Sequence, residues 1–112
     1  MSAVEFHPNG AFVLSGSEDG DIQAWEFPTG RFLKSFDGHT GSIADLATSP
    51  DAKRLASAAK DSTVRIWDLE SGAQVARLDG LRSGVMSVDW SPDGRTLAAS
   101  NQNGEILIWK SE

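Results

Sequence analysis

The sequence predicts an all-β protein that consists of three similar antiparallel sheets, one after another along the chain. Tryptophan recurs every 42 residues, at Trp25, Trp67 and Trp109, and an interval of this size is typical of repeated supersecondary units. Within each interval, Gly, Pro, Asp and Asn separate short apolar runs, as they separate the strands of a meander. The period and the turn residues together predict short strands joined by tight turns.

Two further sets of residues keep the same interval. They are the turn prolines and the polar residues of a later turn: Pro8, Pro50 and Pro92, and Asp19, Asp61 and Asn103. One period shared by three kinds of residue indicates a true repeat. We expect a single segment over 1–112, with repeats at about 1–42, 43–84 and 85–112.

The four strands of a repeat are clearest in the middle one. Ile43–Thr48 is the first predicted strand and ends at a Ser-Pro-Asp turn. Leu55–Ala58, Thr63–Asp68 and Gln74–Leu78 follow, and turns rich in Asp, Ser or Gly end each of them. Short turns pair neighbouring strands antiparallel. The first repeat has the same four strands, whereas the third lacks the outer one.

Two stretches test the strand assignment. Leu55–Ala59 is rich in alanine, which favours helices, but it lies between turns and is shorter than the roughly 10 residues that a helix requires. Ile106–Trp109 is apolar at every position, and Val64–Trp67 nearly so, which is typical of strands buried on both faces. Sheets stacked face to face provide that environment.

Composition excludes several classes of function. The formal net charge is −6 and the ten Lys and Arg residues are scattered, so we expect no nucleic-acid binding. No apolar run approaches the roughly 18 residues of a membrane span, and the N-terminus has no secretory signal pattern, so we expect no membrane partner. The absence of cysteine excludes disulfides and thiolate metal sites and is compatible with an intracellular location.

The middle repeat resembles the WD-repeat (WD40) β-propeller family over nearly its whole pattern. The residues that carry the resemblance are Gly38-His39, Ser49-Pro50-Asp51, Leu55-Ala56-Ser57, Asp61 and Trp67-Asp68. The 42-residue period agrees with the roughly 40–45 residues of a four-stranded propeller blade. The resemblance covers essentially the full chain. It implies three four-stranded antiparallel blades, the last lacking its outer strand, in a partial or oligomer-completed propeller.

The resemblance also implies a hydrogen-bonded structural tetrad in the middle blade, made of His39, Ser57, Asp61 and Trp67. Buried polar groups must find partners, and such a network provides them. The first repeat retains Ser15, Asp19 and Trp25, and the third retains only Trp109, with Leu81, Ala99 and Asn103 at the other positions. We therefore expect full bracing only in the middle blade.

Three blades alone do not close a ring, because propellers use roughly four to eight. If the two open faces leave on the order of 400 Å² of apolar surface bare, about 10 kcal/mol of burial is forgone. A small domain has only about 5–15 kcal/mol of net stability. We therefore expect the chain to associate with other copies of itself or to be part of a longer propeller. Two copies would supply six blades, within the usual range.

The two histidines and one acidic turn are the remaining candidate chemical sites. His7 stands where the other repeats have Ser49 and Ser91, so we interpret it as a turn residue. His39 is interpreted as a tetrad member, because a catalytic base would need a nucleophile or a cleft and none is indicated. Glu18-Asp19-Gly20-Asp21 lacks the distal ligands of a calcium loop and suits a β-turn. We expect no metal, no cofactor and no enzymatic activity.

By the same resemblance, one edge of the blades is a possible partner surface. Its residues precede the tetrad aspartate position or lie in the loop that enters the first strand: Glu18, Lys60, Gln102, Thr40 and Arg82. Taken singly, each is also interpretable as a solvated turn residue. The resemblance implies a protein–protein interaction scaffold with protein partners. The alternative function is a purely structural self-assembling module, natural or designed.

Overall fold

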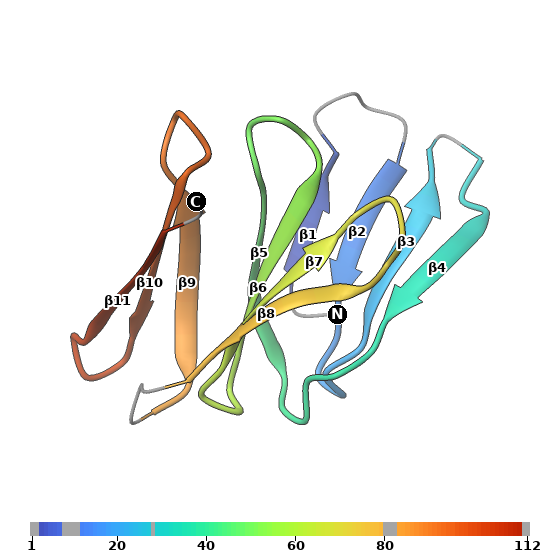
Figure 1. Cartoon of the computed structure of the whole chain (residues 1–112). Coiled ribbons are helices and arrows are strands. Elements are labelled where there is room, and N and C mark those ends of the chain that lie inside the picture. The colour runs from blue at the N-terminus through green and yellow to red at the C-terminus, as the bar shows by residue number, and fades with distance from the viewer. Residues whose placement is uncertain (1–2, 8–11, 28, 80–82, 111–112) are drawn as a thin grey trace.

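The computed structural model describes residues 3–7, 12–27, 29–79 and 83–110, and within these ranges the chain forms eleven strands and no helix (Figure 1). In the described part there is accordingly no helix that could cross a membrane. Pro8, Leu81 and Arg82 lie outside the described residues. The strands are β1 (Ala3–Phe6), β2 (Phe12–Gly16), β3 (Ile22–Glu26), β4 (Phe32–Phe36), β5 (Ile43–Thr48), β6 (Arg54–Ala59), β7 (Val64–Asp68), β8 (Gln74–Leu78), β9 (Val85–Trp90), β10 (Thr96–Asn101) and β11 (Ile106–Lys110).

Each repeat folds into its own sheet, in which every strand pairs antiparallel with the next one along the chain. Blade 1 has the order β1-β2-β3-β4, blade 2 the order β5-β6-β7-β8, and blade 3 only β9-β10-β11. The predicted all-β class, and the missing outer strand of the last sheet, are confirmed. Ile43–Thr48 and Gln74–Leu78 have the predicted bounds, and the alanine-rich stretch is strand β6.

A hydrogen-bonded turn that joins the first two strands recurs in blades 2 and 3. In blade 2, the Ser49 hydroxyl donates to Asp51 Oδ1 at 2.5 Å and accepts from the Arg54 amide at 3.1 Å. In blade 3, Ser91 makes the same two contacts with Asp93 and Thr96, at 2.5 and 3.1 Å. These side chains replace backbone partners that a tight turn cannot supply, which explains why the serine and aspartate recur with the period.

The three sheets stack face to face and bury two apolar layers, which we call the first and second junctions. The first joins blades 1 and 2 and includes Leu14, Ile22 and Phe36 on one side and Ile43 and Leu55 on the other. The second joins blades 2 and 3; its members are Ala56, Ala58, Val64, Ile66, Val85, Val88, Trp90, Leu97 and Ala99. Successive residues of a strand point to opposite faces, so β6 and β7 supply both junctions.

Among the sheets of the described residues, only blade 2 has a neighbour on each side, and burial follows that difference. Val64, Arg65, Ile66 and Trp67 of β7 are all buried, as predicted for this strand. The same prediction for Ile106–Trp109 is wrong for the single chain: Ile106 is 63% exposed and Ile108 is 53% exposed. An apolar sequence favours burial on both faces, but blade 3 has no sheet on its far side (Figure 1).

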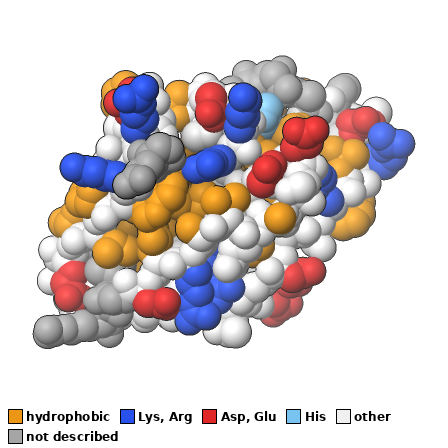
Figure 2. Space-filling model, viewed as in Figure 1, with side chains coloured by type: hydrophobic (Ala, Val, Ile, Leu, Met, Phe, Trp, Pro, Cys, Tyr) orange, Lys and Arg blue, Asp and Glu red, His pale blue; other side chains and the backbone are white. Residues whose placement is uncertain are grey.

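Blades 1 and 3 therefore each present an open apolar face. Register places Val4, Phe6, Val13 and Trp25 on one face of blade 1, opposite the face that packs on blade 2. Ala98, Ile106 and Ile108 share the face of blade 3 that points away from blade 2. Figure 2 shows hydrophobic side chains gathered on the side of the molecule that blade 3 occupies, next to β8. Monomeric proteins rarely expose contiguous apolar patches of this kind.

Close packing of the first junction yields a prediction at Gly16. A methyl group added there would overlap the Ile43 side chain, so we expect Gly16→Ala to destabilise the fold by about 1–3 kcal/mol. Ser100 stands at the same repeat position on the open face, and Ser100→Ala should change the stability by less than about 0.5 kcal/mol. Urea denaturation of the two variants measures both values. Equal costs would show that this junction is not tightly packed.

Candidate functional site

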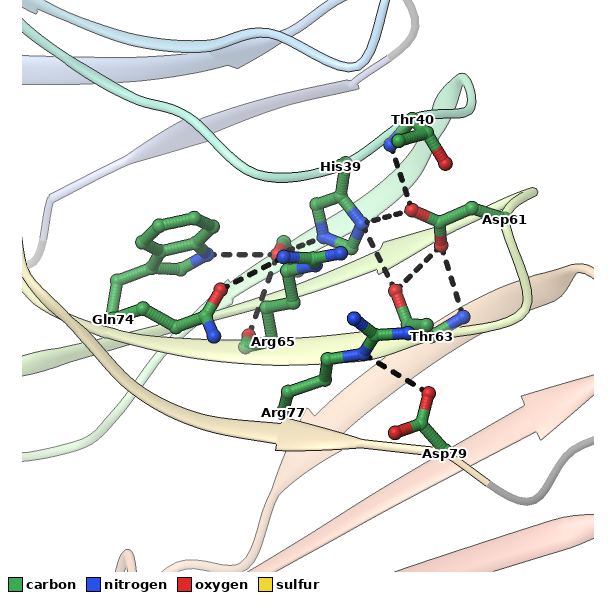
Figure 3. Close-up of polar contacts among 10 residues, drawn as sticks. His39, Thr40, Asp61, Thr63, Arg65, Gln74, Arg77 and Asp79 are labelled. Carbon is green, nitrogen blue, oxygen red and sulfur yellow. Dashed lines mark hydrogen bonds and ion pairs between the residues drawn. The ribbon is translucent and has the colours of Figure 1, made fainter.

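A network of polar side chains lies inside blade 2, on the face that packs toward blade 1. Trp67 Nε1 donates to Ser57 Oγ at 2.9 Å, and Ser57 Oγ lies 2.6 Å from His39 Nε2. His39 Nδ1 lies 2.9 Å from Asp61 Oδ2. The structure thus brings together the four residues of the expected tetrad, from the loop before β5, from β6, from the β6–β7 turn and from β7. Figure 3 shows the contact between the His39 ring and the Asp61 carboxylate.

Asp61 is the hub at the outer end of the network. Its Oδ1 accepts from the Thr63 hydroxyl at 2.6 Å and the Thr63 amide at 3.0 Å, and its Oδ2 accepts from the Thr40 amide at 2.9 Å (Figure 3). Sequence reasoning did not assign a role to Thr63, although a hydroxyl two residues after a turn aspartate is a recognisable signal. The carboxylate thereby ties the β6–β7 turn to the loop that carries His39.

The protonation states follow from these contacts. Burial alone would raise the pKa of Asp61, but hydrogen bonds from Thr63, His39 and the Thr40 amide outweigh it and lower that pKa to about 2. Burial lowers the pKa of His39, although Asp61 acts in the opposite direction. At neutral pH a neutral His39 therefore donates its Nδ1 proton to the Asp61 carboxylate and accepts the Ser57 proton at Nε2.

Ser57, His39 and Asp61 are connected in the order of a hydrolytic triad, but the hydroxyl is inaccessible. Ser57 is 0% exposed, and the Trp67 indole N–H already occupies its oxygen. A nucleophile needs room for a substrate carbonyl and oxyanion donors beside it. The contacts instead brace the blade, because every polar group of the chain from Trp67 to Asp61 finds a partner inside it.

The counterparts of the tetrad in the other blades are only partly connected. Trp25 Nε1 donates to Ser15 Oγ at 2.9 Å in blade 1, whereas Asp19 is exposed and its amide donates to Ser17 Oγ at 3.3 Å. Trp109 packs edge-on against Trp90 in blade 3, with ring centroids 6.2 Å apart. The structure does not join the Ser15–Trp25 pair to Asp19.

Blade 3 braces its β10–β11 turn with a residue that sequence reasoning missed. Asn101 Oδ1 accepts from the amides of Asn103 and Glu105 at 3.1 and 2.9 Å, and its Nδ2 donates to Glu105 Oε1 at 2.7 Å. Asn101 is buried. Its signal in the sequence is weak, because asparagine in turns is common for local reasons alone. The sequence thus places an amide at the start of this turn whose contacts stay within the turn, whereas Asp61 of blade 2 also reaches the preceding loop.

The expected partner surface lies along one edge of the stacked blades, at the bottom of Figure 1. Glu18, Lys60 and Gln102 occupy the β2–β3, β6–β7 and β10–β11 turns, and all three are exposed, as is Thr40. Lys60 and Gln102 line a hollow of about 510 Å³ between blades 2 and 3. Arg82 lies outside the described residues.

The blade 1 end of this edge is acidic. Exposed carboxylates there belong to Glu18, Asp19, Asp21 and Asp37. Among the described residues, no group of three or more His, Cys, Asp or Glu side chains is arranged to hold a metal ion.

His7 lies at the opposite edge of the blades. Its ring is buried, stacks on Phe12 with centroids 4.2 Å apart, and its Nε2 lies 3.0 Å from the Ala52 carbonyl oxygen. His7 directly follows β1, as expected of a turn residue. It also links blade 1 to the β5–β6 turn of blade 2. Sequence alone does not indicate this contact, because it joins residues 45 positions apart.

Comparison with known proteins finds the WD domain, G-beta repeat family at residues 1–26, 30–68 and 72–110. A Lissencephaly-1 homolog from Monosiga brevicollis is 38% identical over 55 residues, 49% of this chain and 13% of the relative. Meiotic recombination protein rec14 from Schizosaccharomyces pombe is 34% identical over 47% of this chain and 18% of its own length. A serine-threonine kinase receptor-associated protein from Bos taurus is 33% identical over 50% and 16%. The matches thus span less than a fifth of these relatives.

Removal of one hydroxyl tests the network. Ser57→Ala leaves Trp67 Nε1 and His39 Nε2 without their buried partner, so we expect a loss of about 1–3 kcal/mol in unfolding free energy. Ser15→Ala in blade 1 is the matched control, because it breaks the same tryptophan contact where water reaches it; its cost should stay below about 1 kcal/mol. Chemical denaturation compares the two. A larger loss for Ser15→Ala would contradict the bracing role.

The two lowered pKa values predict how stability depends on pH. The folded chain protonates His39 less readily than the unfolded chain does. The contribution of His39 to the free energy of unfolding is therefore complete above pH 6.5 and is lost as pH falls below that value. The Asp61 contribution is complete above its ordinary pKa of 3.8 and is lost as pH falls toward about 2. Denaturation at stepped pH should show the first decline in the wild type. A decline of the same size in His39→Gln would assign it to other groups.

Proposed function

The chain belongs to the WD40 repeat family, and we propose that it is a protein–protein interaction scaffold without catalytic activity. Repeats of this family mediate contacts between proteins. The observation that carries the proposal is the single edge along which Glu18, Lys60 and Gln102 stand exposed on three successive blades. Turns held in register by a rigid stack present side chains at fixed spacing, which lowers the entropy lost on binding.

The tetrad supports this role because it anchors part of that edge. Lys60 directly precedes Asp61, and the Thr40 amide donates to the same carboxylate at 2.9 Å. Two candidate contact residues are therefore held by one internal network. A partner that binds them meets a preformed surface, and little ordering of loops is required.

Charge supports a partner with complementary basic groups at the blade 1 end. Glu18, Asp19, Asp21 and Asp37 are exposed there, and the whole chain carries a formal charge of −6. Opposite charge across an interface accelerates association and selects among partners. The burial of Ser57 at 0% exposure supports the absence of a hydrolytic role.

We also propose that the scaffold completes its propeller, either by self-association or as part of a longer chain. The 112 residues would then act as one unit of three repeats, at about 1–42, 43–84 and 85–112. The exposed apolar faces of blades 1 and 3 support completion. They equally suit the second candidate function, a structural self-assembling module that binds no other protein.

Charge reversal at the edge tests the scaffold proposal. Purified chain on beads should retain a defined protein from lysate, and Glu18→Lys with Asp21→Lys should reduce its retention about tenfold or more, because complementary charge is lost. Lys53→Glu is the matched control, since this exposed residue lies at the opposite edge. Equal retention by all three proteins would overturn the proposed surface. A defined homo-oligomer that retains no protein would favour the structural module.

A further inference from the structure

We propose that the two open faces bind each other, so that blade 3 of one copy packs on blade 1 of a second copy. Two such contacts would close a ring of six blades. This inference rests on the completion of the propeller proposed above and identifies its partner as a second copy of this chain. Three observations carry it: two sets of repeat-equivalent apolar residues and one polar contact.

The open face of blade 3 repeats a face that is already buried. Ala56, Val64 and Ile66 of blade 2 pack against blade 3 and are 0% exposed. The residues 42 positions later are Ala98, Ile106 and Ile108, and register places them together on the open face. Blade 3 thus offers a surface of the kind that blade 2 offers to its neighbour.

The open face of blade 1 is equivalent, by repeat position, to the faces of blades 2 and 3 that pack against the preceding blade. Val4, Phe6 and Trp25 stand 84 positions before Val88, Trp90 and Trp109. Val88 and Trp90 are buried in the second junction, and Trp109 packs beside them. Val4 and Phe6 are 53% and 57% exposed in the single chain. Blade 1 therefore presents the surface that a blade 3 face would receive.

A polar contact in the first junction has a repeat-equivalent residue on the open face of blade 3. In the first junction, Glu5 Oε2 accepts the Thr48 amide at 3.0 Å. Ala47 stands 42 residues after Glu5. In the second junction, its carbonyl oxygen accepts a hydrogen bond from the Trp90 side-chain Nε1 at 2.9 Å. Asp89 is the third residue of this series. It is exposed on the open face of blade 3, opposite Ala98 in register.

The contact in the first junction indicates the donor that Asp89 would meet. Thr48 and Trp90 stand at the repeat position of Phe6, so the amide of Phe6 in the second copy corresponds to the Thr48 amide. A carboxylate that accepts a backbone N–H in a dry junction makes a charge-assisted hydrogen bond. Asp89 is one methylene shorter than Glu5, so Asp89→Glu should preserve or tighten the contact.

These faces are unlike, which determines the symmetry of the assembly. Each contact joins a blade 3 face to a blade 1 face, so it is head-to-tail and not a face packed on itself. A head-to-tail contact forms a ring when its rotation closes. Two copies give six blades, and this number lies within the roughly four to eight that propellers use.

Two charge substitutions on exposed residues test the contact and its direction. Phe6→Glu disables the blade 1 face and Ile108→Glu disables the blade 3 face, and each should weaken dimerisation about 100-fold or more by burying an unpaired charge. An equimolar mixture retains one intact contact and should form a heterodimer that neither variant forms alone. Sedimentation equilibrium over a dilution series measures all three samples. Val75→Glu is the control, because Val75 is exposed on β8 of the middle blade and belongs to neither face.

The outcomes separate this inference from the scaffold proposal. A folded wild type that stays monomeric at every concentration, a larger assembly, or normal dimers of Phe6→Glu would overturn the head-to-tail ring. Asp89→Ala should weaken the dimer about tenfold, whereas Asp89→Glu should not. Equal weakening by both substitutions would show that Asp89 does not accept the Phe6 amide. Retention of a protein partner through Glu18 and Asp21 is measured separately, so the scaffold can stand if the ring fails.

Discussion

The fold depends on the need of each sheet to have its apolar faces covered by a neighbouring sheet. Blade 2 satisfies this need on both sides, and its strands β6 and β7 are the most completely buried of the chain. Blades 1 and 3 satisfy it on one side only, although their strands carry residues suited to burial on both. The stack is thus a stable centre with two incomplete ends.

The polar network is the second constraint, and it depends on the first. His39, Ser57 and Trp67 are buried because blade 1 covers the face on which they lie, and in that environment each unpaired polar group would cost about 1–3 kcal/mol. Their mutual contacts remove that cost and extend to Asp61 at the edge. A property of the interior thereby determines the geometry of the exposed turns around Lys60, where a partner surface is proposed.

Local chemistry was predictable from the sequence, whereas contacts across blades were not. Strand bounds in the middle repeat followed from turn residues such as those around Pro50, because turn preferences act within a few positions. The exposure of Ile108 depends on whether another sheet lies beside it, which no local pattern decides. Thr63 and Asn101 were missed because both residue types are ordinary in turns. The contact of His7 with Ala52 joins different repeats and has no sequence period.

Amide hydrogen exchange at low and high protein concentration most directly measures whether neighbouring sheets cover one another's apolar faces. The account predicts the slowest exchange in β6 and β7 at both concentrations, because their faces are covered within one chain. It predicts that exchange in β2 and β10 slows as concentration rises and the open faces meet. Similar protection of all three blades in a dilute monomer would contradict it, since blades with one bare face would then be as stable as the covered one.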